Sequence, residues 1–375
     1  MRIVHVVHHY WPVVGGIENV VRALAEGMAR LGHEVHVVTS THGAQGRPRE
    51  EVVNGVYVHR VRSVRLHYPD LTYPLEYPDG LLKSANVVHG HSQNSLFVVR
   101  VVERAKRLGA RTVMHFMAVD ALNDHPNPII RRVGPLYSRY VLRRALKSAD
   151  VMLVRSMRDK ELLMRYGMEA EYVPDGVHSR LLTREHGGGR FRERYDMSSE
   201  FVLYIGRLHP LKGLGVLIRA MTYVKQQRGP DLVVIGPGDK RPYVALAKRL
   251  GVFDRIRFLG FVDEETKINA IDASLAVVLP SVSDYVEVYP MVISEAWARS
   301  KPVIATAVGG VPYRVKHMVN GLLIPPRDSK ALAEAIVLLA NDKKLAERLG
   351  AEGRKDVRTW EEIVNILIRV YERLA

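Results

Sequence analysis

The chain has 375 residues, of which 47% are hydrophobic and 25% charged, as in an ordinary globular protein. This length exceeds what one hydrophobic core usually serves, so we expect two domains. The absence of cysteine excludes disulfides and thiolate metal sites, and no apolar run is long enough for a transmembrane helix. The formal net charge of +15 favours anionic partners, without choosing among nucleotide diphosphates, lipid surfaces, phosphorylated acceptors and nucleic acid.

Short apolar segments alternate with amphipathic ones, which is typical of a parallel β-sheet covered by helices on both faces. In the first half, a strand is predicted at 3–7 and a helix at 17–31, with Gly32 at the helix C-terminus. Further strands are predicted at 35–39, 87–89, 112–115 and 151–154. The segment 60–83 is rich in Pro and Tyr, which predicts a long functional loop or an irregular insertion.

The composition changes at 186–199, a polar, Gly-rich segment that is typical of an interdomain linker. A second α/β series follows it. Its strands are predicted at 201–205, 232–235, 256–259, 276–279 and 302–305. Its helices are predicted at 215–227, 242–250, 263–273, 292–299, 329–339, 343–357 and 360–374.

The segment 204–213, Tyr-Ile-Gly-Arg-Leu-His-Pro-Leu-Lys-Gly, follows a predicted strand and precedes a predicted helix. Arg207 and Lys212 therefore lie where the N-terminus of a helix already favours an anion. A guanidinium and an ammonium group at this place could neutralise a diphosphate without a metal ion. The alternative is that both are solvated charges beside a turn.

Two carboxylates, Glu287 and Glu295, lie eight residues apart. Glu295 falls within an apolar helical segment, where a surface position explains it poorly, and Glu287 precedes that helix. Carboxylates accept hydrogen bonds from vicinal hydroxyls, so one can hold a ribose and the other a hexose. Backbone N–H groups near Met291 and Val292 would face the same ligand. Structural pairing of the carboxylates with arginine or lysine is the alternative.

These features resemble the group 1 glycosyltransferases, a family with the GT-B fold, and the resemblance covers nearly the whole chain. The motifs that carry it are weak singly and specific in this order: Gly15-Gly16-Ile17-Glu18, His115, Val173-Pro174-Asp175-Gly176-Val177, 206–213, 234–238, 258–260, Glu287 with Glu295, 301–305 with Gly309-Gly310, and Asn320-Gly321-Leu322. The implied fold class is α/β, with two doubly wound Rossmann-like domains facing across a cleft that holds the ligand.

This resemblance, with the composition change, sets the expected domain boundaries. An N-terminal, acceptor-side domain is expected at 1–185 and a nucleotide-sugar-binding domain at 200–357, with 186–199 as the linker. By analogy with the family, the C-terminal helix at about 358–375 is expected to pack back on the first domain.

The resemblance also implies individual roles at the donor site. Arg207 and Lys212 are similar to the pair that binds the donor diphosphate, Glu295 to the acceptor of the ribose hydroxyls, and Glu287 to the carboxylate that contacts the donor sugar. The other implied donor-binding positions are Gly15 and Gly16, whose amides would approach the phosphates, the main chain at Tyr289, Pro290, Met291 and Val292, and Phe261 near the base.

His115 resembles the active-site histidine near the donor sugar, and it completes the implied catalytic set with Glu287, Arg207 and Lys212. Its alternative role is that of a core histidine at a strand end. His89 and His91 also lie near a strand end, and for them the structural role is favoured. Asp175 stands where the family often has Asn, and the longer spacing from His115 to Asp120 weakens any role for Asp120.

The implied reaction is transfer of a hexose from a UDP-, GDP- or ADP-sugar with retention at the anomeric carbon. The barrier of this reaction comes mainly from separating charge between an oxocarbenium-like sugar and the diphosphate. Each fixed cation would therefore stabilise the transition state by a few kcal/mol. The chain contains no Asp-x-Asp, the spacing by which many transferases hold a divalent ion. We therefore expect no metal ligands, no cofactor, and activity that survives EDTA.

The acceptor is expected to be a sugar, a glycan or a lipid-linked molecule. Segment 129–147 combines basic, aromatic and apolar residues, which predicts an amphipathic helix able to lie on an anionic membrane surface. The Pro- and Tyr-rich segment adds Arg60, Arg62, Arg65, His67, Tyr68 and Tyr73. An ordinary packed helix with a solvated basic face is the alternative. No secretory signal pattern opens the chain, so a cytoplasmic location is expected, with or without peripheral association with the inner face of the membrane.

Other function classes stay open at this point. Sugar-nucleotide epimerases share this fold and donor site, and a non-enzymatic protein that binds anionic polymers would explain the charge. Nucleic acid is not expected as a partner, since no basic stretch is interleaved with a stacking platform. A nicotinamide dehydrogenase is disfavoured because the first strand–helix turn carries Gly15-Gly16 rather than G-x-G-x-x-G. The donor base and sugar, the acceptor and the oligomeric state are not indicated by the sequence.

Overall fold

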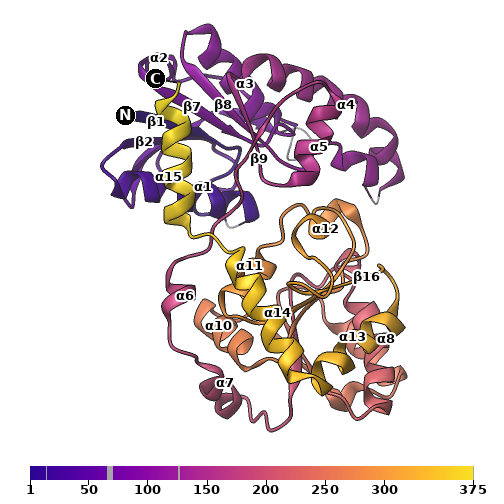
Figure 1. Cartoon of the computed structure of the whole chain (residues 1–375). Helices are drawn as coiled ribbons and strands as arrows, with labels where there is room; N and C mark the ends of the chain where they lie inside the picture. The colour runs from indigo at the N-terminus through magenta and orange to yellow at the C-terminus, as the bar shows by residue number, and fades with distance from the viewer. Residues whose placement is uncertain (14, 66–70, 126, 375) are drawn as a thin grey trace. The chain divides into compact units, whose positions relative to one another are not determined.

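A computed structural model describes residues 1–13, 15–65, 71–125 and 127–374 (Figure 1). The chain divides into two compact units. Unit 1 contains Met1–Asp175 together with Trp360–Ala375, and unit 2 contains Gly176–Thr359. Each unit is built around one mostly parallel sheet, which confirms the predicted α/β class.

Unit 1 holds an eight-stranded sheet in the order β10-β9-β8-β7-β1-β2-β4-β3, parallel except for the edge strand β3. Its strands are β1 (Arg2–Val6), β2 (Glu34–Ser40), β3 (Glu50–Val53), β4 (Val56–Val61), β7 (Val87–His91), β8 (Arg111–Phe116), β9 (Val151–Val154) and β10 (Glu171–Tyr172). Its helices are α1 (Gly16–Arg30), α2 (Asp79–Ser84), α3 (Leu96–Arg107), the short 3-10 turn η2 (Ala121–Asp124), α4 (Pro128–Ser148), α5 (Met157–Arg165) and α15 (Trp360–Glu372).

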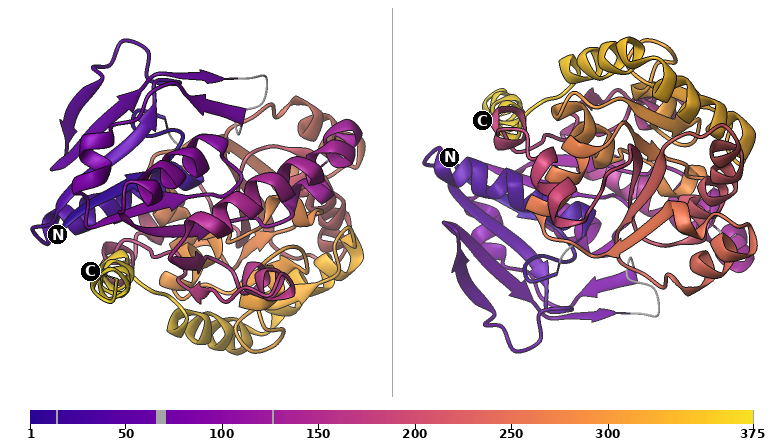
Figure 2. Two further views of the ribbon diagram at one scale, coloured as in Figure 1. Left: turned by 90° about the horizontal axis from the view of Figure 1, so that it is seen from above. Right: turned by 90° about the horizontal axis from the view of Figure 1, so that it is seen from below.

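The two faces of this sheet differ in polarity. Helix α3 packs on one face, where Val4, Val6, Val88 and Met114 form an apolar core. The residues that alternate with them on β1, β7 and β8 include four histidines and point to the other face. Helices α1 and α15 lie side by side in unit 1, so the yellow last helix lies beside the indigo start of the chain (Figures 1 and 2).

Unit 2 holds a six-stranded, wholly parallel sheet in the order β13-β12-β11-β14-β15-β16. Its strands are β11 (Phe201–Ile205), β12 (Asp231–Ile235), β13 (Ile256–Gly260), β14 (Val277–Leu279), β15 (Val303–Thr306) and β16 (Leu322–Ile324). Its helices and 3-10 turns are α6 (Arg180–Thr183), α7 (Gly188–Arg194), η3 (Pro210–Lys212), α8 (Leu214–Gln226), α9 (Arg241–Arg249), η4 (Phe253–Arg255), α10 (Glu264–Ala273), η5 (Asp284–Val286), α11 (Met291–Ala298), α12 (Val311–Arg314), α13 (Ser329–Asn341) and α14 (Lys343–Lys355).

Both faces of the second sheet are buried, which explains its unbroken apolar strands. Along β11, Val202 and Tyr204 join the core formed with α8 and α13, whereas Phe201 and Leu203 join the core formed with α10 and α11. The strands of unit 2 predicted from the sequence lie within two residues of those observed. One further strand, β16, was not predicted, and it contains Leu322 of the Asn320-Gly321-Leu322 motif.

The segment 60–83 is more regular than predicted where it is described. It begins at the end of β4, continues through the antiparallel pair β5 (Ser63–Arg65) and β6 (Thr72–Pro74), and ends in α2. These strands have three residues each, too short for a periodic signal, and this is why the sequence indicated only an irregular insertion.

The predicted linker at 186–199 is wrong. This segment forms α7, which packs on α10, and the Phe191 side chain is buried in the core of unit 2. The Gly187 N–H donates to the Asp272 carboxylate, and a Cβ atom at Gly188 would lie 3.1 Å from the backbone of Ala273. Close helix approach, not flexibility, explains these glycines. The boundary falls after Asp175, ten residues before the predicted end of the first domain at 185.

Replacing Phe191 with alanine should therefore destabilise unit 2 by about 3–5 kcal/mol, since it leaves a cavity in a packed core. The exposed Arg190 on the same helix provides the control, and Arg190→Ala should change the stability by no more than about 0.5 kcal/mol. Urea unfolding of the full chain measures both. Equal unfolding midpoints for the two variants would mean that 186–199 behaves as a linker after all.

Candidate functional site

The loop that follows β11 in unit 2 carries the two cations selected from the sequence. The Arg207 side chain is exposed, and it makes no hydrogen bond or ion pair within the described part of the chain. Its backbone is anchored, because the Tyr204 hydroxyl donates to the Arg207 carbonyl over 2.9 Å. Lys212 ends the 3-10 turn η3, immediately before α8. One free and one partly buried cation thus stand at the carboxyl end of the central strand.

The structure brings Lys212 and Glu287 together. The Lys212 Nζ lies 2.8 Å from Glu287 Oε1 and also donates to the Val286 carbonyl at 3.4 Å. The Ser281 hydroxyl donates to the same carboxylate oxygen. Glu287 is only 2% exposed, so its charge is balanced by an ammonium group and a hydroxyl rather than by water. The pairing of this carboxylate with a lysine, considered from the sequence, is therefore present.

Glycines hold the loop that carries Glu287. The Gly310 N–H donates to the Glu287 carbonyl over 2.7 Å, and the Gly309 N–H donates to Asp284. Gly309 has φ +55°, and a Cβ atom there would lie 2.1 Å from the Glu287 carbonyl oxygen. At Gly310 a Cβ atom would lie 2.1 Å from the Val288 carbonyl oxygen. The Gly-Gly motif after β15 is therefore needed for the close approach of these two loops.

Helix α11 begins directly after this loop. Pro290 precedes it and makes no side-chain capping bond, so it leaves the first N–H groups of the helix, those of Met291 and Val292, without a cap of its own. One turn further, Glu295 pairs with Lys267 of α10 over 2.8 Å. Partial burial by itself lowers the pKa of Lys267, but the nearby carboxylates, of which Glu295 contributes most, outweigh it and raise that pKa above its usual value.

Tyr289 and Pro290 are fixed by Arg314 of α12. The guanidinium carbon lies 3.9 Å from the centroid of the Tyr289 ring. The same group donates to the Pro290 carbonyl at 2.9 Å and to the Ser294 hydroxyl at 2.6 Å. Arg314 therefore closes the turn that leads into α11 from both sides.

Phe261, expected near a base, follows β13 and is 81% exposed. A phenyl ring this exposed on a monomeric surface is available for stacking with an aromatic ligand. Both Phe261 and the start of α11 belong to unit 2, as do all the other donor-site residues selected from the sequence except Gly15 and Gly16.

Gly15 and Gly16 open α1 in unit 1. A Cβ atom at Gly15 would lie 2.2 Å from a carboxylate oxygen of Glu18, the movable end of a side chain, and a Cβ atom at Gly16 would meet nothing within 4 Å. Packing inside the chain therefore does not require glycine at position 16. This open space is compatible with a ligand that approaches the backbone closely.

His115 lies in β8 of unit 1 and is 2% exposed. Burial, assisted by the nearby charge of Arg155, lowers the pKa of His115 to about 3, so the imidazole is neutral at physiological pH. Arg155 itself forms a buried ion pair with Asp175. This pair gives a reason for aspartate at position 175, where the family often has Asn. Asp120 accepts a hydrogen bond from Tyr166 near this strand end.

Helix α4 carries an exposed apolar stripe. Ile129, Val133, Leu136 and Tyr140 are each more than half exposed, and their spacing of three or four residues places them on one helix face. Beside the stripe, a hollow of about 370 Å³ is lined by Leu136, Arg139, Tyr140, Arg143, Arg144 and Lys147. We call these residues together the α4 surface.

The basic and aromatic residues expected from 60–83 contribute less than predicted. Arg60 is 2% exposed and binds Glu51 and the carbonyls of Pro48 and Trp11, so it is not part of any surface. Arg62 pairs with Glu76. His67 and Tyr68 lie outside the described residues. Arg65 and Tyr73 are exposed, so among the described residues of this set Arg60 is the one that is withdrawn from the surface.

Sequence reasoning missed the residues that hold the site in place. Lys267, Ser281 and Arg314 each contact a selected residue, but from elements distant in sequence. None belongs to a motif, and their roles follow only from the order of the strands. A cation four residues after the Gly309-Gly310 motif is the one feature of the sequence that could have suggested a role for Arg314.

Comparison with known proteins identifies relatives along nearly the whole chain. Residues 190–356 match the family described as glycosyl transferases group 1, and residues 15–174 match the glycosyl transferase 4-like domain. An uncharacterised glycosyltransferase of Methanocaldococcus jannaschii is 29% identical, over 99% of this chain and 98% of the relative. A D-inositol 3-phosphate glycosyltransferase of Streptomyces avermitilis is 28% identical, over 95% and 82%.

Solved structures resemble the whole chain as well. A sucrose-phosphate synthase of Thermosynechococcus elongatus has a TM-score of 0.79 at 24% identity, covering 100% of this chain and 98% of that one. HepE of Anabaena, solved in complex with UDP, has a TM-score of 0.76 at 21% identity, covering 100% and 99%. These similarities show that the fold is GT-B, as expected from the sequence.

The Gly-Gly contact leads to a prediction about the Glu287 loop. Gly310→Ala should lower the unfolding free energy by at least about 1 kcal/mol, because the added Cβ collides with the Val288 carbonyl. Gly189→Ala is a suitable control, since its Cβ would enter open space on α7 and alanine favours helix. Chemical denaturation compares them. A Gly310→Ala variant as stable as the control would show that the loop is not tightly held.

Proposed function

Since the chain belongs to the group 1 glycosyl transferases, we propose that it transfers a hexose from a nucleotide diphosphate-sugar to an acceptor and retains the anomeric configuration. The observation that carries the proposal is the cluster in unit 2 where Lys212, Glu287 and the N-terminus of α11 meet. A fixed cation, a buried carboxylate and free backbone N–H groups are complementary to a sugar joined to a diphosphate.

In this proposal the diphosphate binds to Arg207 and Lys212, and the first N–H groups of α11 complete its coordination. Glu295 accepts the ribose hydroxyls, Glu287 accepts hydroxyls of the donor sugar, and Phe261 lies near the base. The UDP complex of HepE supports a nucleotide in this fold, and for this chain the base is left to experiment.

Donor binding would exchange partners at both carboxylates. Glu287 forms an ion pair with Lys212, and Glu295 forms one with Lys267. A diphosphate would compete for Lys212, while a sugar hydroxyl would donate to the carboxylate that Lys212 leaves. The ligand then replaces charge-assisted contacts with others of the same kind, so neither buried charge is left without a partner.

Catalysis follows from the same cations. As the glycosidic bond breaks, negative charge grows on the leaving diphosphate, and Arg207, Lys212 and the α11 dipole stabilise that charge in place. We propose that no divalent ion takes part, since the chain has no Asp-x-Asp.

His115, neutral because of its lowered pKa, would act as a hydrogen-bonding group rather than as an acid. The anomer of the first product, read by NMR, tests retention.

For the acceptor, the α4 surface supports a membrane-associated substrate. Its exposed apolar stripe and its flanking arginines have the character of helices that lie on anionic lipid. No helix within the described residues is both long enough and apolar enough to cross a bilayer. We propose that unit 1 binds the surface of anionic membranes through α4 and takes a lipid-linked acceptor there.

A thermal-shift panel with UDP, GDP, ADP and their common sugars tests the donor site. One nucleotide should raise the melting temperature of the wild type, by an amount equivalent to about 2.7 kcal/mol at a hundred times its dissociation constant. Lys212→Ala and Glu295→Ala should lose most of this shift. Lys225→Ala, which removes an exposed lysine of α8 that pairs with Asp254 of η4, should keep it.

The shift should be the same with EDTA or with Mg²⁺, because the charge at the diphosphate is supplied by side chains. A shift that appears only with Mg²⁺ would contradict the metal-free donor site. A nucleotide-sugar that is converted without any acceptor would instead indicate an epimerase.

Vesicle sedimentation tests the membrane proposal. The wild type should bind anionic vesicles and dissociate as salt rises, whereas Leu136→Asp with Arg143→Glu should weaken binding at least about tenfold through lost apolar burial and charge. Arg249→Glu on α9, in unit 2, changes the net charge equally per residue and should have little effect. Binding that is insensitive to salt and to the α4 variant would refute the proposal.

A further inference from the structure

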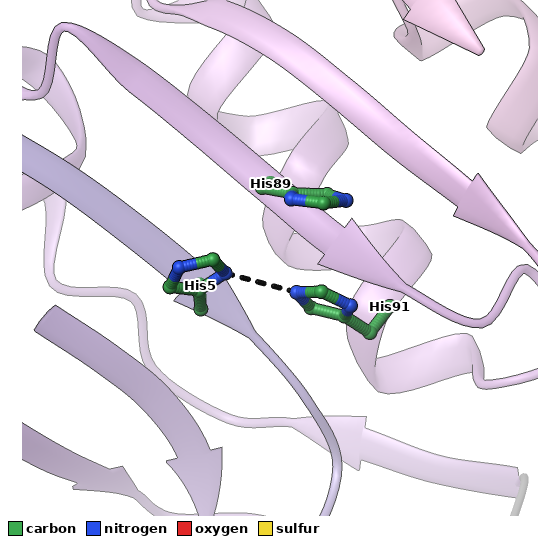
Figure 3. A group of neighbouring side chains, drawn as sticks. All are labelled: His5, His89 and His91. Carbon is green, nitrogen blue, oxygen red and sulfur yellow. Dashed lines mark hydrogen bonds between the residues drawn. The ribbon is translucent and has the colours of Figure 1, made fainter. Parts of the chain in front are cut away.

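Four histidines meet on one face of the sheet in unit 1. The strand register places His5 of β1 opposite His89 of β7, and His91 of β7 opposite His115 of β8. Residues two apart on a strand share a face, so all four rings lie on the side away from α3. His5, His89 and His91 form the closest group (Figure 3), and the ring centroids of His89 and His91 lie 4.1 Å apart.

These three rings are fully buried and uncharged. His5, His89 and His91 are each 0% exposed. Burial lowers the pKa of His5 to about 3, and it lowers the pKa of His89 and His91 well below the usual value. A neutral imidazole has one N–H group and one lone pair, and its lone pair is what binds a metal ion.

The hydrogen bonds within the group leave nitrogens unused. His5 Nδ1 and His91 Nε2 lie 2.9 Å apart, as the dashed line in Figure 3 marks, and His89 Nδ1 lies 2.6 Å from the Tyr371 hydroxyl. The other three ring nitrogens, His5 Nε2, His89 Nε2 and His91 Nδ1, are buried with no hydrogen-bond partner among the described residues. Each such atom costs about 1–3 kcal/mol, a cost that a bound ion would remove from the atoms that ligate it.

We propose that His5, His89 and His91 bind a transition-metal ion, with zinc as the resident ion. One nitrogen from each ring lies within 4.8 Å of the other two. Ligands about 2.1 Å from a tetrahedral zinc are about 3.4 Å from each other, so the rings must rotate and give up the His5–His91 hydrogen bond, whose lone pair the metal ion would take. Imidazole suits zinc, copper, nickel and cobalt, and in this cysteine-free chain it is the strongest ligand type for them.

Tyr371 supplies the outer contact that such sites require. Histidines that bind metal usually donate their second N–H group to an oxygen, which fixes the ring and its tautomer. The His89–Tyr371 contact has this form, with the phenol buried in α15. Tyr371 is therefore a positioning residue in the proposed site rather than a ligand.

The charge around the group limits what else binds. Among its neighbours, Arg155 is paired with Asp175, so it adds no net charge. None of the three ligands is anionic, and a dication would therefore retain a water or hydroxide ion in its fourth position. The three ligands belong to β1 and β7 and Tyr371 belongs to α15, so the ion would stabilise the sheet of unit 1 and its contact with α15.

Metal uptake by the full chain, without an appended histidine tag, tests the proposal. After treatment with a chelator and desalting, the protein should take up one zinc ion per chain by elemental analysis, and its melting temperature should rise. Cobalt added in place of zinc should produce the visible absorption bands of a four- or five-coordinate ion.

Variants assign the ligands. The double variant His5→Gln with His91→Gln should lose the zinc, and Tyr371→Phe should keep the stoichiometry while its affinity falls by about 10- to 100-fold. His59→Gln is the matched control, because His36 Nδ1 and His59 Nε2 form a similar 2.9 Å pair with no third histidine. It should bind zinc like the wild type.

The proposal fails if the folded wild type takes up no zinc, or if the double variant retains it. If the double variant does not fold, X-ray absorption of the zinc-loaded wild type decides, since three imidazole ligands are required and fewer would overturn the assignment. The nucleotide thermal shift reports on unit 2 in the same samples. A normal nucleotide shift without zinc uptake would reject only the metal site.

Discussion

The hydrogen bond from the Gly310 N–H to the Glu287 carbonyl fixes the loop on which the candidate site of unit 2 depends. It fixes the backbone from which the Glu287 carboxylate reaches Lys212 and from which α11 starts. If this loop moved by even 1 Å, the cation, the carboxylate and the helix N-terminus would no longer converge. The glycine pair, Arg314 and Ser281 are best understood as the support of one rigid turn, and preorganisation of this kind is what electrostatic catalysis needs.

Most of the fold was predictable because parallel strands buried on both faces are unbroken apolar runs, such as Phe201–Ile205. The linker prediction failed because α7 is polar and glycine-rich, and it is attached to the core chiefly by Phe191. Among the site residues, the cations and carboxylates were found through motifs. Their partners were not, because the Lys267–Glu295 pair joins two helices whose contact depends on how they pack over the sheet.

The positively charged side chains of the protein fall into two groups, buried and exposed. Arg60, Arg155 and Arg299 are buried, and each is paired with a carboxylate, so they connect loops and carry no field to the outside. Arg299 also donates to the Leu181 and Arg184 carbonyls, which anchors the segment that enters unit 2. Many other cations are exposed, and among the exposed ones a ligand is proposed for those on the α4 surface and for Arg207. Net charge alone could not have separated these groups.

Because α15 belongs to unit 1, the two units can be completed only in a fixed order during translation. The His89 ring and the Tyr371 hydroxyl that contacts it are 282 residues apart, and the whole of unit 2 is made between them. While the ribosome makes unit 2, the histidine face of the first sheet lacks its last covering helix. Unit 2 is one continuous stretch and has all its strands before α15 emerges. The second unit to be translated is thus the first that can be completed, because the sheet of unit 1 gains α15 only after all of unit 2 has been made.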